Sequence, residues 1–215
     1  EQVLITTKFN GYRDQVRTVD GMMQELDTSL KKLKTTYLDV FMIHAVNGKD
    51  DLAVIDKLYQ GMALLKEQRV IRYSGFSSMD SADKSAEIIK ALDFDVCMLA
   101  INPTTYGNYE TVAVPEAIKK NMGIFAMKVM RDVVGKNGVT PLELMNWALD
   151  RTGVSSAVIA HTGMDVLEQN IALAKGFKPS LVAKSSQTRL EARLKPFAGA
   201  HALSWARPGY QDAVI

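Results

Sequence analysis

The feature that most constrains the fold is a sixfold alternation of strand-like and helix-like segments. Short runs of β-branched and other apolar residues alternate with longer segments in which apolar residues recur every three or four positions. The first helix-like segment, 19–34, places Met22, Leu26, Leu30 and Leu33 on one face in this way. Regular alternation of this kind predicts right-handed crossovers between parallel strands, in either a closed barrel or an open, doubly wound sheet.

The predicted elements cover most of the chain. Strands are expected at 3–9, 37–44, 70–76, 96–101, 123–130 and 156–160, and helices at 19–34, 52–65, 81–92, 114–121, 141–149 and 164–174. No glycine-rich dinucleotide loop follows the first strand, which argues against the open sheet. We expect a barrel-like region over 1–175, then a polar helix at 180–194 within a C-terminal segment, 176–215, that ends in a peripheral tail.

Composition narrows the classes of partner. The 215 residues are 47% hydrophobic and 23% charged, with a formal net charge of +2 spread along the chain. This balance predicts a small-molecule partner, no nucleic acid and no membrane, since neither a basic patch nor a run of about twenty apolar residues occurs. The single cysteine, Cys97, excludes an intrachain disulfide, reads as a buried small hydrophobe and is typical of a cytoplasmic protein; no metal site is expected.

Polar residues stand where the predicted strands end. In a parallel barrel, functional groups gather at the carboxyl ends of the strands, because the loops that follow form a pocket there. From position alone, Lys8 is equally a surface lysine, and His44 is more commonly a hydrogen-bonded core residue than a catalyst. The candidates at strand ends are Lys8, His44, Ser77, Ser78, Asn102, Lys128, His161 and Thr162.

Two of these strand ends carry a resemblance to a known family. Residues 23–44, MQELDTSLKKLKTTYLDVFMIH, resemble the segment of aldo-keto reductases that leads from a leucine-rich helix into a strand ending in histidine. Upstream, LITTK resembles the preceding strand of that family with its terminal lysine. The resemblance covers Glu1 to about Lys175 and implies a parallel (β/α)8 TIM barrel that is incomplete, with barrel strands three to eight present.

The resemblance implies an NAD(P)H-dependent oxidoreductase that reduces aldehydes or ketones by hydride transfer. The family uses a tyrosine as proton donor, a lysine and an aspartate that assist it, and a histidine that orients the substrate. Lys8 and His44 match the lysine and the histidine. The tyrosine and aspartate would belong to the barrel unit before Glu1, so the chain as written is expected to lack the proton donor.

The implied cofactor contacts are scattered along the chain. Gly75-Phe76-Ser77-Ser78 resembles the family turn that binds the nicotinamide carboxamide, while Met98 replaces a frequent glutamine. The residues expected to contact the cofactor are Ser77, Ser78, Met127, Lys128, His161, Thr162, Gly163 and Asn170, the last four in an adenosine-phosphate loop. The resemblance favours NADP(H), with NAD(H) as the alternative.

Other interpretations stay open at this level. The 75–78 motif can be a purely structural polar turn, and Lys128 a structural lysine. The whole chain can be a catalytically inactive barrel that acts as a dinucleotide-binding or regulatory module. A Schiff-base lyase that uses Lys8 or Lys128 is a third class, and it requires a desolvated amine.

Overall fold

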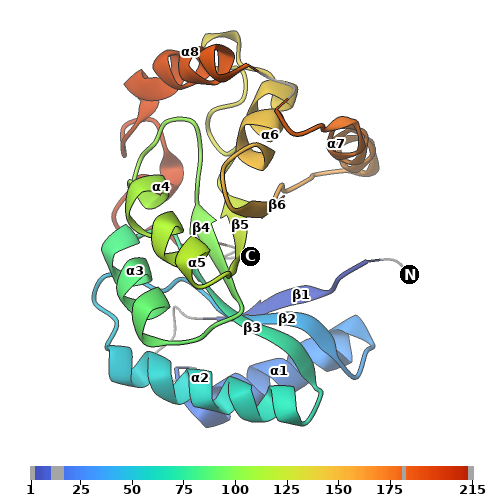
Figure 1. Ribbon diagram of the computed structural model, residues 1–215. Helices are drawn as coiled ribbons and strands as arrows, with labels where there is room; N and C mark the ends of the chain where they lie inside the picture. Colours follow the sequence, from blue (N-terminus) through green and yellow to red (C-terminus); the bar gives the residue numbers. More distant parts are fainter. Residues whose placement is uncertain (1–2, 11–16, 181–182, 213–215) are drawn as a thin grey trace. The chain divides into compact units, whose positions relative to one another are not determined.

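The computed structural model describes residues 3–10, 17–180 and 183–212. Within them, six strands form one sheet in the order β1-β2-β3-β4-β5-β6, which is the order of the chain (Figure 1). The strands are β1 (Thr6–Phe9), β2 (Leu38–Ile43), β3 (Ile71–Ser78), β4 (Val96–Ala100), β5 (Gly123–Met127) and β6 (Val154–Ala157). The pairs β1–β2, β2–β3 and β5–β6 are parallel, which confirms the predicted α/β class.

Helical segments follow every strand. They are α1 (Val19–Leu33), α2 (Leu52–Glu67), α3 (Ala82–Ala91), α4 (Tyr109–Val112), α5 (Val114–Lys119), α6 (Pro141–Leu149), α7 (Met164–Gly176) and α8 (Lys184–Leu194). Local sequence explains several helix starts: the Ser81 side chain accepts from the Lys84 N–H, and Thr140 forms a capping box with Glu143. Among the described residues, none of these helices is long and apolar enough to cross a membrane.

The fold divides into two compact units. Unit 1 contains residues 1–98 and 112–123, and unit 2 contains residues 99–111 and 124–215. The expected division of the chain near residue 175 stays a prediction.

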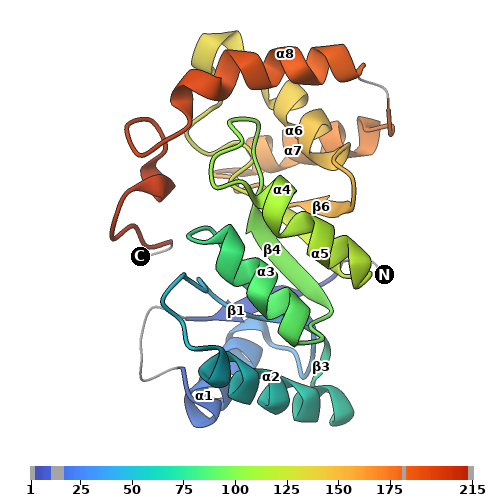
Figure 2. The same ribbon diagram turned by 60° about the vertical axis from the view of Figure 1, so that its left-hand side comes forward.

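Unit 1 is built on β2, whose six residues are all buried. The helices α1 and α2 lie along the same side of β1, β2 and β3 (Figures 1 and 2). Their apolar faces supply Met22 and Ile55 to a core that also contains Phe9 and Phe41, all fully buried. The predicted helical stripe of α1 is confirmed at Met22 and Leu26, whereas Leu33, in the last turn, is 46% exposed.

A buried carboxylate, that of Asp39, links three segments of unit 1. Asp39 of β2 is only 2% exposed. Its Oδ2 accepts from the backbone N–H of Ile5 at 2.8 Å, and its Oδ1 accepts from Arg72 at 2.8 Å. The Ile5 N–H lowers the pKa of Asp39 below its ordinary value, burial opposes this, and the Arg72 guanidinium adds to the lowering.

We expect Asp39→Asn to lower the free energy of unfolding at pH 7 by about 1 kcal/mol, because it weakens charge-assisted hydrogen bonds. A carboxylate with a lowered pKa stabilises the fold above its ordinary pKa, and this contribution is lost as the pH falls through the folded-state pKa. The gap between wild type and variant in urea unfolding should therefore close at acidic pH. Asp27→Asn, at an exposed i,i+4 pair with Lys31, is the matched control; a pH-independent gap would contradict the assignment.

In unit 2, β5 pairs with β6, and the helices α6 and α8 lie side by side (Figure 2). The Trp147 indole N–H of α6 donates to Glu191 of α8 at 2.8 Å. The C-terminal tail adds Leu203 and Trp205 to the buried residues. Asp132 holds this tail, since its carboxylate accepts from both N–H and O–H of Ser204 at 2.7 Å.

Several predicted boundaries are wrong. The first strand begins at Thr6, not at residue 3. The fifth strand stops at Met127, not at residue 130, because Lys128 has a φ of 64° and breaks the extended backbone. The sixth strand covers Val154–Ala157 instead of 156–160, since its register with β5 begins at Ile124↔Val154. The C-terminal helix begins at Lys184, and Ser180, with a φ of 59°, is not helical.

Candidate active site

The ends of β1 and β2 bring Lys8 and His44 to the same edge of unit 1. In the parallel register Lys8 is level with Met42 and Phe9 is level with Ile43. His44 follows Ile43 directly, so the two predicted catalytic residues are two positions apart along neighbouring strands. Both side chains are partly exposed. Fold topology therefore gathers an amine and an imidazole from residues 36 positions apart in the sequence.

The Lys8 side chain contacts another strand of unit 1, β4, and does not extend into open solvent. Its Nζ lies 3.8 Å from Sδ of Met98, which is 4% exposed and belongs to β4. A thioether sulfur is a weak acceptor, so the contact with Met98 is a weak hydrogen bond. Met98 stands where the family has glutamine, and its side chain contacts Lys8.

Ser77 supports the loop that carries His44. Its Oγ accepts from the Ala45 N–H at 3.2 Å, and its carbonyl accepts from the Val46 N–H at 2.8 Å. Ala45 has a φ of 57°, so the chain turns sharply immediately after His44. Ser77 is 1% exposed and Ser78 fully buried. The 75–78 motif is thus a structural support for the His44 loop, a role that sequence analysis did not assign to it.

Gly75 in the same motif permits a close backbone approach. A Cβ at this position would lie 2.5 Å from the carbonyl oxygen of Val96 and 3.3 Å from Cγ of Met42. Only glycine fits here without movement of β4.

Met127 and Lys128 lie in unit 2, where the tail covers the lysine. Lys128 Nζ contacts Asp212 at 2.5 Å and lies 5.0 Å from the centre of the Tyr210 ring. Burial lowers the pKa of Lys128, and the Asp212 carboxylate opposes that effect. The pKa of Tyr210 is raised to about 12 by burial and by Asp212, which accepts from its hydroxyl at 2.9 Å. The tail residues Tyr210 and Asp212 carried no recognisable signal in the sequence.

Three of the predicted adenosine-phosphate residues lie at the start of α7, and the fourth, Asn170, lies in its second turn. His161 and Thr162 are exposed, Gly163 and Asn170 partly exposed. No side chain caps the helix at Gly163, which leaves backbone N–H groups at its start for a ligand or water. However, a Cβ on Gly163 would lie 2.7 Å from Oδ1 of Asp165, so a carboxylate occupies the space beside the expected phosphate position.

The comparisons with known proteins fit this arrangement. The model of the aldo/keto reductase family matches residues 1–131, a span that includes both strand-end motifs. The chain belongs to the aldo/keto reductase family. This confirms the resemblance drawn from the sequence, while no curated protein matches.

Solved structures of aldo-keto reductases share the fold. One from Pseudomonas aeruginosa is 20% identical with a TM-score of 0.63, and the match covers 80% of this chain and 65% of that one. The holo form of a Bacillus halodurans aldo-keto reductase is 14% identical with a TM-score of 0.69, over 98% and 74% of the two chains. A thermostable aldo-keto reductase complexed with the inhibitor epalrestat is 19% identical with a TM-score of 0.69, over 89% and 71%. This chain therefore has the fold of part of an aldo-keto reductase barrel, as predicted.

Some of the residues expected to contact a nicotinamide dinucleotide suit that role, and others do not. At the nicotinamide end, the Ser77 hydroxyl oxygen accepts from the Ala45 N–H, so its own proton is available to a ligand. Ser78 is fully buried, and its Oγ lies 3.5 Å from the Ser81 carbonyl oxygen. At the phosphate end, the uncapped start of α7 fits an anion, but the negative charge of Asp165 opposes anion binding.

For a metal ion, the described residues hold no group of three or more His, Cys, Asp or Glu side chains. Cys97 is buried as predicted, and burial raises its pKa to about 12.

Proposed function

We propose that the chain serves a cytoplasmic NAD(P)(H)-dependent oxidoreductase that reduces small aldehydes or ketones. The observation that carries this proposal is the convergence of Lys8 and His44 at one end of neighbouring parallel strands, inside the region that matches the family. A bound nicotinamide would supply the hydride. NADP(H) is the proposed cofactor, with NAD(H) as the alternative.

The proposed roles follow from the chemistry of each side chain. The Lys8 ammonium stabilises the negative charge that develops on the carbonyl oxygen, and His44 orients the substrate by a hydrogen bond. Ser77 holds the His44 loop and offers its hydroxyl proton to the carboxamide. No residue of this sequence matches the family's tyrosine or aspartate. Lys8 and His44 would therefore stabilise charge and bind the substrate, and a water molecule would supply the proton that the reduced carbonyl oxygen takes up.

In unit 2, the residues proposed to contact the cofactor lie around α7 and at the end of β5. His161, Thr162 and the N–H groups at the start of α7 would hold phosphate, and Asn170 would contact adenine. Met127, at the end of β5 and 6% exposed, would pack against a flat ring, while Lys128 stays paired with Asp212.

Titration with NADPH, followed by the change in its fluorescence, tests cofactor binding, and an aldehyde panel tests turnover. Saturable binding together with oxidation of NADPH by an aldehyde supports the proposal. Absence of binding at millimolar NADPH or NADH contradicts it.

Asp165→Asn sharpens this test. Removing a negative charge beside the proposed phosphate position should tighten NADPH binding about threefold, because helix-terminus charge effects are of this size. Asp20→Asn, in the first turn of α1, makes the same change at a helix start without a predicted ligand and should leave the Kd unchanged. Weaker or equal binding by Asp165→Asn would contradict the phosphate position.

A dinucleotide-binding module without catalysis is the second candidate. The observation that favours it is Met98, which stands in place of the family's glutamine and contacts Lys8. Tight NADPH binding without turnover of any aldehyde would select this function. The lyase alternative at Lys128 stays open, because burial lowers the pKa of that amine, as a Schiff base requires, while Asp212 opposes the lowering.

A further inference from the structure

A separate pocket of about 220 Å³ lies within unit 2, at the end of β4. Its lining comes from the 99–111 segment, from Arg151, two residues after α6, and from α8, and includes Ile101, Asn102, Tyr106, Glu110, Arg151 and Glu191. None of the predicted catalytic or cofactor residues lines it. The volume equals about seven water molecules, which suits a very small organic ligand.

Asn102 presents an unused hydrogen-bond donor in this pocket. The residue is 2% exposed. Its Oδ1 accepts from both the N–H of Thr104, at 2.9 Å, and its hydroxyl, at 2.6 Å. These two donors determine which way the amide points, and they leave the buried Nδ2 without a partner. A buried amide donor left unpaired costs about 1–3 kcal/mol, so an acceptor oxygen on a ligand would recover free energy.

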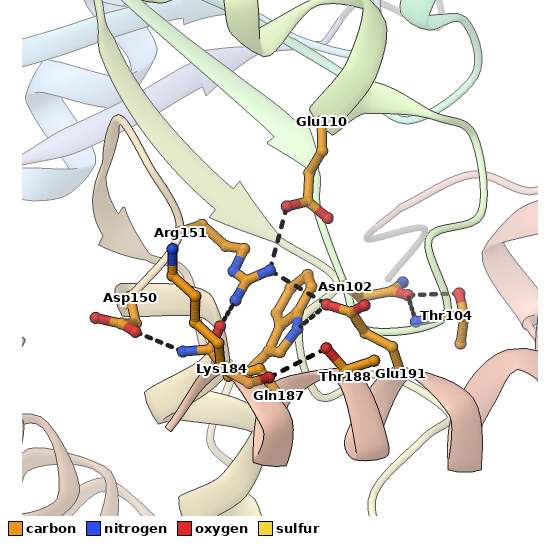
Figure 3. A network of polar contacts seen from close by, with 10 residues as sticks. Asn102, Thr104, Glu110, Asp150, Arg151, Lys184, Gln187, Thr188 and Glu191 are labelled. Carbon is orange, nitrogen blue, oxygen red and sulfur yellow. Dashed lines mark hydrogen bonds and ion pairs between the residues drawn. The ribbon is translucent and has the colours of Figure 1, made fainter. Parts of the chain in front are cut away.

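Charged groups that line the same pocket surround Arg151. Its Nη1 lies 3.2 Å from Glu191 and 3.8 Å from Glu110, and its Nη2 donates to Gln187 (Figure 3). The guanidinium also lies 4.6 Å from the Trp147 ring centre, and its buried Nε has no hydrogen-bond partner. Arg151 is therefore held in place on several sides.

The lining carries one cation and two carboxylates. Glu191 also accepts from Trp147, whereas Glu110 has only the longer contact with Arg151. Burial raises the pKa of Glu110, Arg151 opposes this, and Glu191 adds to the increase. The excess of negative charge disfavours an anion, and Glu110 is an acceptor available to a ligand donor.

We propose that this pocket binds a small, neutral, polyhydroxylated molecule, with one hydroxyl oxygen accepting from Asn102 Nδ2 and a hydroxyl proton donated to Glu110. A hydroxyl group supplies both the acceptor and the donor that the two sides require. Apolar surface from Ile101 and Tyr106 suits the C–H faces of such a molecule. A simple diamine satisfies Glu110 but offers no acceptor to Asn102, and a dicarboxylate meets the opposite difficulty.

Calorimetric titration and saturation-transfer NMR with sorbitol and glucose test the proposal on the purified protein. Asn102→Asp keeps the oxygen that Thr104 needs and removes the Nδ2 donor; Glu110→Gln keeps the size and removes the carboxylate. Each should weaken binding of the better probe about tenfold. Because one variant adds a negative charge and the other removes one, parallel losses point to lost hydrogen bonds rather than to net charge.

Glu116→Gln, on the exposed α5 pair with Lys119, is the matched control and should bind like wild type. Putrescine and malonate serve as charged probes. The proposal is overturned if neither polyol binds at millimolar concentration, if putrescine or malonate binds more tightly, or if both variants bind like wild type. Circular dichroism checks folding, and Glu110→Gln decides alone if Asn102→Asp does not fold.

Discussion

Replacing Lys8 with methionine is expected to lower the rate constant of carbonyl reduction, kcat, by about a hundredfold, the usual cost of losing one group that stabilises a developing oxyanion. Methionine is one atom shorter than lysine and packs well against the sulfur of Met98, so the change removes charge with little loss of contact. Measurement of kcat and KM separately for one aldehyde checks this, because a charge that acts in the transition state affects kcat more than KM.

Lys32→Met is the matched control for this experiment. Lys32 is exposed on α1, so the same chemical change there should leave kcat within twofold of wild type. The thermal unfolding midpoint of both variants should stay near that of wild type. If Lys8→Met keeps wild-type kcat while NADPH still binds, Lys8 is not part of the reaction, and the binding-module function gains support.

Gly75→Ala is expected to destabilise the protein by about 3 kcal/mol, the upper end of the usual cost of overpacking. The added Cβ would lie 2.5 Å from the Val96 carbonyl oxygen, and backbone in a central strand cannot yield as a flexible side chain does. Since Gly75 precedes Ser77, movement here should also disturb the His44 loop. Urea unfolding gives the first effect, and carbonyl reduction the second.

Gly123→Ala is the matched control for Gly75→Ala, because both glycines lie in strands. Its Cβ would meet Val96 side-chain carbons at 3.6 Å, an ordinary van der Waals distance, so the free energy of unfolding should change by less than about 1 kcal/mol. Equal effects of the two substitutions would mean that the β3–β4 approach at Gly75 is not the cause. A large loss of stability in Gly75→Ala but not in Gly123→Ala would explain why the 75–78 motif begins with glycine.

The sequence by itself determined the fold class and the order of the elements. Apolar spacing is a local property, so the stripe of α1 and the continuous run of β2 were visible without any tertiary information. Parallel topology then required Lys8 and His44 to share one edge. Strand ends were less predictable, since the left-handed backbone of Lys128 ends β5 inside a run that remains apolar.

Only the tertiary structure decided what the polar groups contact. The pairing of Lys128 with Asp212 joins residues 84 positions apart, and nothing in either local sequence indicates it. Likewise, the unpaired Nδ2 of Asn102 is recognised only from the structure, in which Thr104 donates to the Asn102 oxygen and Arg151 and Glu110 line the same pocket. Hydrogen bonds and ion pairs depend on distances of a few ångströms between remote segments, which the periodicity of a sequence does not encode.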